Sequence, residues 1–355
     1  MMAAAKNRNA QAEQELRAFA DALKAGAPDR LYFFFGEEHY LMERYLEQLR
    51  DVLIPEGTGA FNHHRLEGRA VTAAAISDAV DLLPVFSERT LIEIWDYDPF
   101  KAPEEDRGIL QALAADLPEY VCLVFVFDTI PYAPDRRLKL YKPLMAAGHA
   151  VEFMLQDEDK LVRWIRRHVQ EEGKSISPAD ARYLSEITGG RMTALHTEIA
   201  KLCSYASGPA VTRADIDVCV TPSVEAAVYR LADAMIAGDY RRSSSLLNDI
   251  LELHEPVQKV LYALHQTMKN VLYARLALDA GKNAEWLEQT FHFARSFQAS
   301  NAISAARRLT LDRCRGMVLL CADAALQANS FGRSDSELLS GLLIDLCYGK
   351  KADLL

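Results

Sequence analysis

The chain has few of the residues that mark fibrous, secreted or membrane-spanning proteins. Among its 355 residues are only 17 glycines and 13 prolines, which excludes collagen-like repeats and long low-complexity linkers. Its longest uninterrupted apolar run, Tyr120–Phe127, is far shorter than the ~20 residues needed to cross a bilayer. The first residues include no apolar segment typical of a secretory signal, so we expect a cytoplasmic protein with no membrane contact.

The cysteines and the charge exclude two further kinds of site. None of the six cysteines forms a Cys-x-x-Cys pair or lies at zinc-ligand spacing with a histidine, so we expect reduced thiols and no metal site. The net charge is −10, from 40 Lys and Arg against 50 Asp and Glu. Proteins that hold DNA by neutralising its phosphates need a basic face. We therefore do not expect this acidic chain to bind DNA in that way.

The sequence also lacks the common catalytic and phosphate-binding motifs. It contains no HExxH, GxSxG or GxGxxG. A phosphate-binding loop needs GxxxxGK[ST] between a strand and a helix, but Gly36 is followed by Glu37 and Glu38, whose carboxylates would repel phosphate. The Gly-Lys-Ser at Gly173–Ser175 follows the end of an expected helix and lacks the earlier glycine. We predict no catalytic residue and no cofactor.

Short apolar runs predict a parallel sheet in the first part of the chain. The run Val121–Phe127 is apolar on both faces, which is typical of a strand in a sheet covered by helices on both sides. Thr72 is suited to cap a helix that ends at or before Leu83, because Pro84 follows. We therefore predict an α/β domain over residues 1–155, with strands at Leu31–Phe35, Thr90–Trp95, Val121–Phe127 and Ala150–Phe153 and helices at Glu38–Leu53 and from Ala73.

From residue 156 onward the patterns are helical, and we expect no strand. Ser177-Pro178 is typical of a helix start and Gly189-Gly190 of a helix end. A turn-forming segment around Pro222 indicates a boundary. We predict a small helical domain over residues 156–222 and an all-α domain over residues 223–355.

One apolar pair lies where a helix meets a strand and admits two interpretations. Val85 and Phe86 follow Pro84 and precede a polar Ser-Glu-Arg stretch. The pair either fills the core of its own domain or protrudes as an anchor for the pocket of a partner. Burying one Phe in such a pocket would contribute roughly 1.5–3 kcal/mol. The preceding helix is expected to turn a stripe inward, composed of Ile76, Val80 and Leu83, with Leu82 beside it.

Several stretches, taken in order, resemble a known family. They are Leu31–Leu49, Phe61–Gly68, Leu82–Ile94, Leu161–Leu202 and Val228–Leu251. Their order and spacing are similar to those of the delta subunits of the bacterial DNA polymerase III clamp loader, and the resemblance extends over nearly the whole chain from about residue 30. The first of these stretches is similar to the start of the family, with Gly36-Glu37-Glu38 where ATP-binding relatives carry a phosphate-binding loop.

The resemblance implies an architecture, a function and a set of partners. It implies an AAA+-like domain without an ATP site, a helical lid and a helical collar. The function implied is that of a non-catalytic subunit of the bacterial, cytoplasmic DNA polymerase III holoenzyme, which as a complex is a DNA-directed DNA polymerase. The subunit would bind the sliding clamp (beta) and favour opening of its ring. Its other partners would be the gamma/tau and delta prime subunits, through the collar, and primer–template DNA in the assembled complex.

The resemblance also assigns a clamp-binding segment. Phe86 matches the aromatic anchor of the family, Val85 the apolar residue before it, and Leu83 the residue two positions earlier. Together with Leu82 these are the predicted clamp-binding residues. The sequence departs from the family pattern at Asp81, where clamp-binding peptides often begin with Gln, and at Pro84.

A second candidate site lies near the C-terminus, in the polar segment 329–335. There Phe331 with Arg333 would stack on a nucleobase, a contact that tolerates any base sequence. The alternative is a loop that only connects two helices.

Three other functions remain open. The first is an active AAA+ ATPase or another nucleotide-dependent enzyme of DNA metabolism. The second is a delta-prime-type loader subunit, and the third is a helical scaffold. The missing lysine after Gly36 argues against the ATPase. The lack of zinc-binding cysteines and of a Ser-Arg-Cys motif argues against the delta-prime type.

Overall fold

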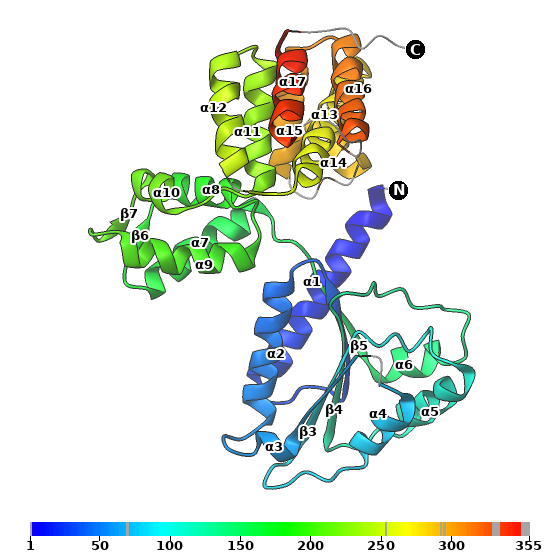
Figure 1. The fold of residues 1–355 in the computed structure, drawn as a ribbon. Helices are drawn as coiled ribbons and strands as arrows, with labels where there is room; N and C mark the ends of the chain where they lie inside the picture. The colour runs from blue at the N-terminus through cyan, green and yellow to red at the C-terminus, as the bar shows by residue number, and fades with distance from the viewer. Residues whose placement is uncertain are drawn as a thin grey trace. The chain divides into compact units, whose positions relative to one another are not determined.

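The computed structural model describes residues 2–68, 71–252, 254–291, 293, 296–328 and 334–348 (Figure 1). It divides into two compact units, residues 1–155 and residues 156–355. The three-domain division expected from the sequence, with boundaries after residues 155 and 222, stays a prediction.

Unit 1 is built on a five-stranded parallel sheet with the order β2-β3-β4-β1-β5. Of the three inner strands, β3 and β4 are buried along their whole length, as the sequence predicts for Val121–Phe127 in a sheet covered on both faces. The strands are β1 (Leu31–Gly36), β2 (His63–Glu67), β3 (Thr90–Trp95), β4 (Val121–Phe127) and β5 (His149–Phe153). Of these five strands, only β2 was not predicted, because its sequence His-His-Arg-Leu-Glu has a single apolar residue.

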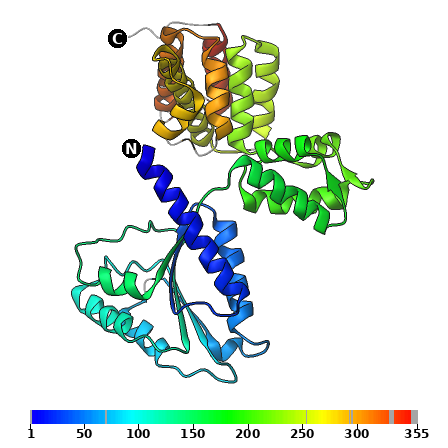
Figure 2. The same cartoon turned by 180° about the vertical axis from the view of Figure 1, so that it is seen from behind.

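Helices cover both faces of this sheet (Figure 1). One core lies under α1 and α2 and includes Phe19, Tyr32 and Phe34. The opposite core lies under α4, α5 and α6 and includes Phe33 and Phe125, whose rings stack at 5.2 Å. The helices are α1 (Met2–Lys24), α2 (His39–Leu53), α3 (Gly59–Asn62), α4 (Ala73–Val80), α5 (Glu104–Ala115) and α6 (Tyr141–Ala147). Figure 2 shows α1 running beside α2, on the side of the sheet that ends in β5.

Helix α4 begins and ends as predicted, but the inner face expected of Leu83 is not found. The side chain of Thr72 accepts a hydrogen bond from the backbone of Ala75 at 3.1 Å and caps the helix. The helix stops at Val80, and its expected inward stripe stops there too: Ile76 and Val80 are buried, whereas Leu83 is 71% exposed. The prediction for Leu83 is wrong because a helical spacing places a residue on the inner face only while the helix continues.

The first part of unit 2 is a small helical bundle with one short sheet. One helix begins at the predicted Ser177, whose side chain accepts from the backbone N of Asp180, and Asp157 caps the helix before it by accepting from that of Lys160. A pair of two-residue parallel strands, β6 (Ser175–Ile176) and β7 (Ala210–Val211), contradicts the expectation of no strand, since two residues are too few to show a period. The helices are α7 (Glu158–Glu171), α8 (Pro178–Ile187), α9 (Met192–Tyr205) and α10 (Arg213–Cys219).

In the rest of unit 2, all regular elements among the described residues are α-helices. Two cores hold it together, one centred on α11, α13, α16 and α17 and the other on α13 and α15. The helices are α11 (Val224–Ile236), α12 (Tyr240–Glu252), α13 (Val257–Asp279), α14 (Ala284–Phe291), α15 (Ser296–Ala306), α16 (Leu311–Gln327) and α17 (Asp335–Tyr348). Within the described residues, no helix is both long and apolar enough to span a bilayer.

Candidate protein-binding site

The loop Asp81–Arg89, which we call the anchor loop, joins α4 to β3 and carries the most exposed large apolar side chain of unit 1. Phe86 is 88% exposed, Leu82 is 49%, and Val85 is 38%. The ring of Phe86 therefore lies outside the core of its own domain, and the first interpretation of the Val85–Phe86 pair is wrong. Exposed aromatic residues grouped with other apolar side chains mark interaction sites more often than single exposed leucines do.

Phe86 also has an unusual backbone conformation. Its φ angle is 55°, in the left-handed region that favours glycine. For a residue with a Cβ this conformation costs roughly 1–2 kcal/mol. Such strain persists where the surrounding contacts determine the backbone, and it is concentrated at functional positions.

Asn62 supplies one of those contacts, from the end of α3. Its side chain is fully buried, and its Oδ1 accepts a hydrogen bond from the backbone N of Val85 at 2.7 Å. Its Nδ2 donates to the backbone O of Val85 at 2.7 Å and to the carbonyl of Thr58 at 3.4 Å. Both backbone polar groups of the residue before Phe86 are therefore held by one carboxamide.

Polar contacts also fix the anchor loop after Phe86. The hydroxyl of Ser87 lies 3.3 Å from the carbonyl oxygen of Leu53 and 3.0 Å from that of Arg89, and it accepts from the Arg89 backbone N at 3.3 Å. The guanidinium of Arg89 donates to the carbonyl oxygens of Pro28, Asp29 and Val121. The loop is tied to the domain on both sides of Phe86, while the ring itself stays free.

A buried ionic cluster lies at the strand that begins after Asn62. Glu93 on β3 is fully buried and receives two bonds from Arg50 at 2.6 and 2.8 Å, one from His63 at 2.9 Å and one from Trp95 at 3.0 Å. Burial by itself raises the pKa of Glu93, but the hydrogen bonds from His63, Arg50 and Trp95 outweigh it and lower the pKa to about 2. The cluster joins α2, β2 and β3, and so fixes the segment that presents Asn62.

The carboxyl ends of the strands, where open parallel sheets usually bind ligands, are acidic and closely packed. Gly36 ends β1 with a φ of +134°, and a Cβ there would lie 2.3 Å from the carbonyl oxygen of Phe153. Glu38 is 3% exposed and its backbone N donates to the same oxygen at 3.0 Å. A phosphate at the start of α2 would meet a buried carboxylate and no lysine.

The neighbouring strand ends are tied to one another. Asp96, after β3, accepts from the backbone of Asp128 and of Thr129, each at 2.9 Å, and from the hydroxyl of Thr129 at 2.5 Å. The carboxylate of Asp128 lies 2.6 Å from Nδ1 of His39. These bonds give the acidic groups structural roles in turns. Within the described part of the chain, no three His, Cys, Asp or Glu side chains are grouped to hold a metal ion.

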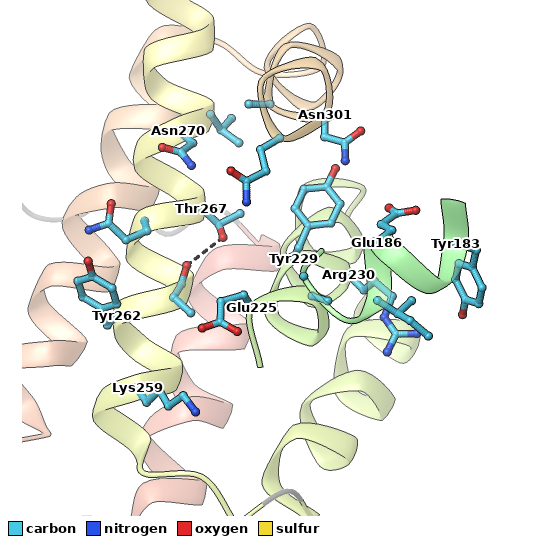
Figure 3. Close-up of a pocket in the computed structure, with 18 residues that line it drawn as sticks. Tyr183, Glu186, Glu225, Tyr229, Arg230, Lys259, Tyr262, Thr267, Asn270 and Asn301 are labelled. Carbon is cyan, nitrogen blue, oxygen red and sulfur yellow. Dashed lines mark hydrogen bonds between the residues drawn. The ribbon is translucent and has the colours of Figure 1, made fainter. Parts of the chain in front are cut away.

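Unit 2 contains a cavity of about 290 Å³ among α8, α11, α13 and α15 (Figure 3). Tyr229, whose pKa burial raises to about 12, points toward Asn301 in this view. The lining also includes carboxamides, among them Gln266 and Asn270, and the charged side chains of Glu225 and Lys259. The described lining includes no cysteine, histidine or serine. Sequence reasoning missed it because four separate helices contribute.

The second candidate from the sequence, Phe331 with Arg333, lies outside the described residues. Its proposed contact with a nucleobase stays a prediction.

Comparisons with known proteins give the relatives of the chain. Residues 32–154 match the family model described as DNA polymerase III, delta subunit. The DNA polymerase III subunit delta of Bacillus subtilis (strain 168) is 22% identical over 331 residues, which cover 91% of this chain and 94% of that protein. A probable DNA polymerase III subunit delta of Aquifex aeolicus (strain VF5) is 21% identical over 232 residues, 63% of this chain and 64% of the relative.

The chain is a relative of the DNA polymerase III delta subunit. The solved structure of the Bacillus subtilis DNA clamp loader delta protein shares its fold, with a TM-score of 0.63 at 19% identity over 93% of this chain and 99% of that one. The resemblance and the fold class expected from the sequence are confirmed. The segment matched by the delta-subunit model includes Asn62, the Glu93 cluster and the whole anchor loop.

Proposed function

We propose that this delta-subunit relative binds the sliding clamp (beta) through the anchor loop, with Leu82, Leu83, Val85 and Phe86 as contacts. The observation that carries the proposal is the 88% exposed ring of Phe86, held on a loop that is bonded to the domain on both sides, through the backbone of Val85 and the hydroxyl of Ser87. The similarity to delta subunits supports the choice of partner.

The energetics favour such an anchor. Transferring one exposed Phe into an apolar pocket contributes roughly 1.5–3 kcal/mol, which is the range of a central interface residue. A loop already fixed in its bound conformation loses little freedom on binding, so more of that free energy appears as affinity.

The same contact favours opening of the clamp ring. A partner that binds the opened ring better than the closed ring shifts the equilibrium toward the opened one, by no more than the difference between the two affinities. Each ~1.4 kcal/mol of that difference is a tenfold change in the ratio. The chain would therefore work as a binding subunit and would not catalyse a reaction.

The chain does this without binding ATP itself, in our proposal. The close approach of Gly36 to Phe153 and the buried carboxylate of Glu38 leave a phosphate no favourable partner at the start of α2. The alternative function, an active AAA+ ATPase, requires binding at that position, and an equilibrium ATP-binding measurement on the isolated chain distinguishes the two.

Residues 223–355 would form the collar that joins the gamma/tau and delta prime subunits in a bacterial, cytoplasmic complex with primer–template DNA. Exposed apolar side chains on two of its helices support this assignment. Leu319 and Leu326 are 41% and 71% exposed and lie seven positions apart on α16, so they share a face. Tyr348 at the end of α17 is 72% exposed, and its ring lies 5.8 Å from that of Tyr240.

The deciding experiment is clamp binding by Phe86→Ala, measured by surface plasmon resonance with the purified sliding clamp. Loss of the ring that the clamp would bury should weaken clamp binding by roughly tenfold to a hundredfold. Val218→Ala is the matched control, because Val218 is 71% exposed but lies on α10 in the other unit. A decrease of less than about threefold, with circular dichroism unchanged, would mean that the anchor loop is not the clamp-binding segment.

A further inference from the structure

The buried carboxamide of Asn62 is a polar group for which the proposed function has given no role so far. Its Oδ1 lies 2.7 Å from the backbone N of Val85 and its Nδ2 lies 2.7 Å from the backbone O of the same residue, which is 23 positions later in the chain. The side chain itself never reaches the surface. It therefore cannot contact a partner, and any effect on binding must pass through the anchor loop.

Apolar packing does little to hold the anchor loop in place. Three of its apolar side chains, Leu82, Leu83 and Phe86, are about half exposed or more, and Val85 is 38% exposed. The fixed conformation must then come from polar contacts. Before Phe86 these are the two bonds to Asn62, and after it those of Ser87 and Arg89.

The bonds act next to the strained residue. Phe86 is at a φ of 55°, which an unrestrained loop would leave for an extended or right-handed conformation. With Val85 held at both its N–H and its C=O, the direction of the chain entering Phe86 is fixed. The ring is then presented to solvent in one orientation.

Asparagine is suited to this contact for a chemical reason. A carboxamide has one acceptor and two donors in a plane, so it can bind the N–H and the C=O of one residue together. An aspartate at this position would accept from Val85 N but would place its second oxygen against the Val85 carbonyl. A serine hydroxyl is too short to bridge both groups.

We propose that Asn62 is a positioning residue for partner binding, which orders the anchor loop so that Phe86 meets the partner in its bound orientation. The inference rests on the proposed function, since it concerns the same loop. It predicts that the affinity for the sliding clamp depends on a side chain that the clamp never touches.

The first test is the pair Asn62→Asp and Asn62→Ser, each assayed for binding to the purified sliding clamp. We expect either variant to bind roughly tenfold more weakly, the effect of losing a buried hydrogen bond and the order it gives. Amide hydrogen exchange should accelerate at Val85 while β3 and β4 keep their protection. If Asn62→Asp does not fold, as judged by circular dichroism, Asn62→Ser gives the measurement.

The second test combines each variant with Phe86→Ala. Because Asn62 acts through the ring of Phe86, the Asn62 substitution should change clamp affinity less than about twofold once the ring is absent. An equal loss with and without the ring would show a general structural effect and overturn the inference. So would a folded Asn62 variant that binds like wild type.

The two proposals can fail separately. If Phe86→Ala itself leaves binding intact, the clamp-binding role of the loop fails and the inference with it. If Phe86→Ala weakens binding while both Asn62 variants retain it, only the positioning role of Asn62 is wrong.

Discussion

Phe86 combines a nearly complete exposure with a backbone conformation that glycine adopts more easily than any other residue. Evolution of stability alone would favour glycine at such a position. An aromatic residue kept there, with its neighbours bonded to the domain, is better explained by a partner that takes the ring.

Substitution at this one residue separates strain from burial. Glycine relieves the left-handed strain and alanine keeps it, while neither loses a buried contact. We expect Phe86→Gly to be more stable than Phe86→Ala by about 0.5–1 kcal/mol, after the greater freedom of glycine in the unfolded chain is allowed for. Urea unfolding read by hydrogen exchange in β3 and β4 reports unit 1 alone; equal stabilities would contradict the strain at this position.

Single residues were also where sequence reasoning reached least far. Asn62 contacts Val85, 23 positions later in the chain, and Arg50 contacts Glu93, 43 positions later. No local sequence pattern therefore predicts either contact. The sequence analysis did select Phe86 as a candidate anchor, because an aromatic residue after a helix-ending proline is visible in the sequence. Whether it filled its own core could only be decided from where the loop runs.

At the scale of elements, the strands with continuous apolar runs were predicted and β2 was not. Its residues are polar because the strand lies at the edge of the sheet, where His63 and Arg65 reach other side chains instead of the core. The guanidinium of Arg65 lies 4.0 Å from the ring centroid of Trp95. The inward face expected for Leu83 was wrong for the opposite reason, since an apolar spacing continued beyond the end of α4.

The Glu93 cluster gives a stability prediction at this scale. Arg50→Met keeps a long apolar stem but removes both bonds to the buried carboxylate, which stays charged at neutral pH without its main partner. We expect a loss of about 3–5 kcal/mol in the free energy of unfolding. Arg44→Met on the same helix is the control, because the Arg44–Glu47 pair is exposed. A loss for Arg50→Met no greater than that of the control would show that the cluster does not stabilise unit 1.

The depressed pKa of Glu93 sets the pH dependence of that loss. The ordinary pKa is 4.5 and the folded value is about 2, so the stabilisation is complete above about 4.5 and is lost as the pH falls toward 2. The difference between wild type and Arg50→Met should therefore be constant from neutral pH to about 5 and should shrink below that. Urea midpoints across this range measure it; a difference that grows on acidification would exclude the assignment.

At the scale of the whole molecule, unit 1 is an open parallel sheet of the kind that usually binds ligands at its strand ends, but these ends are occupied by hydrogen bonds within the protein. The carboxylate of Asp96 accepts from the backbone of Asp128, that of Asp128 contacts His39, and Glu38 is buried at the start of α2. The missing lysine after Gly36 and the two carboxylates that follow it led the sequence analysis to expect no ATP site, which stays a prediction. The sequence analysis did not predict the cavity of unit 2, which α8, α11, α13 and α15 form together.

The last prediction concerns ATP, which in our proposal this subunit does not bind. If the anchor loop binds by shape and apolar contact alone, the affinity of the isolated chain for the sliding clamp should be the same with and without ATP and Mg²⁺. Surface plasmon resonance at saturating nucleotide measures this directly, and isothermal titration of ATP into the chain should give no saturable heat. A change of more than about threefold in clamp affinity would require a nucleotide to distinguish two states of this subunit. The strand ends of unit 1 would then bind phosphate despite their carboxylates, and the alternative of an active AAA+ ATPase would replace the function proposed here.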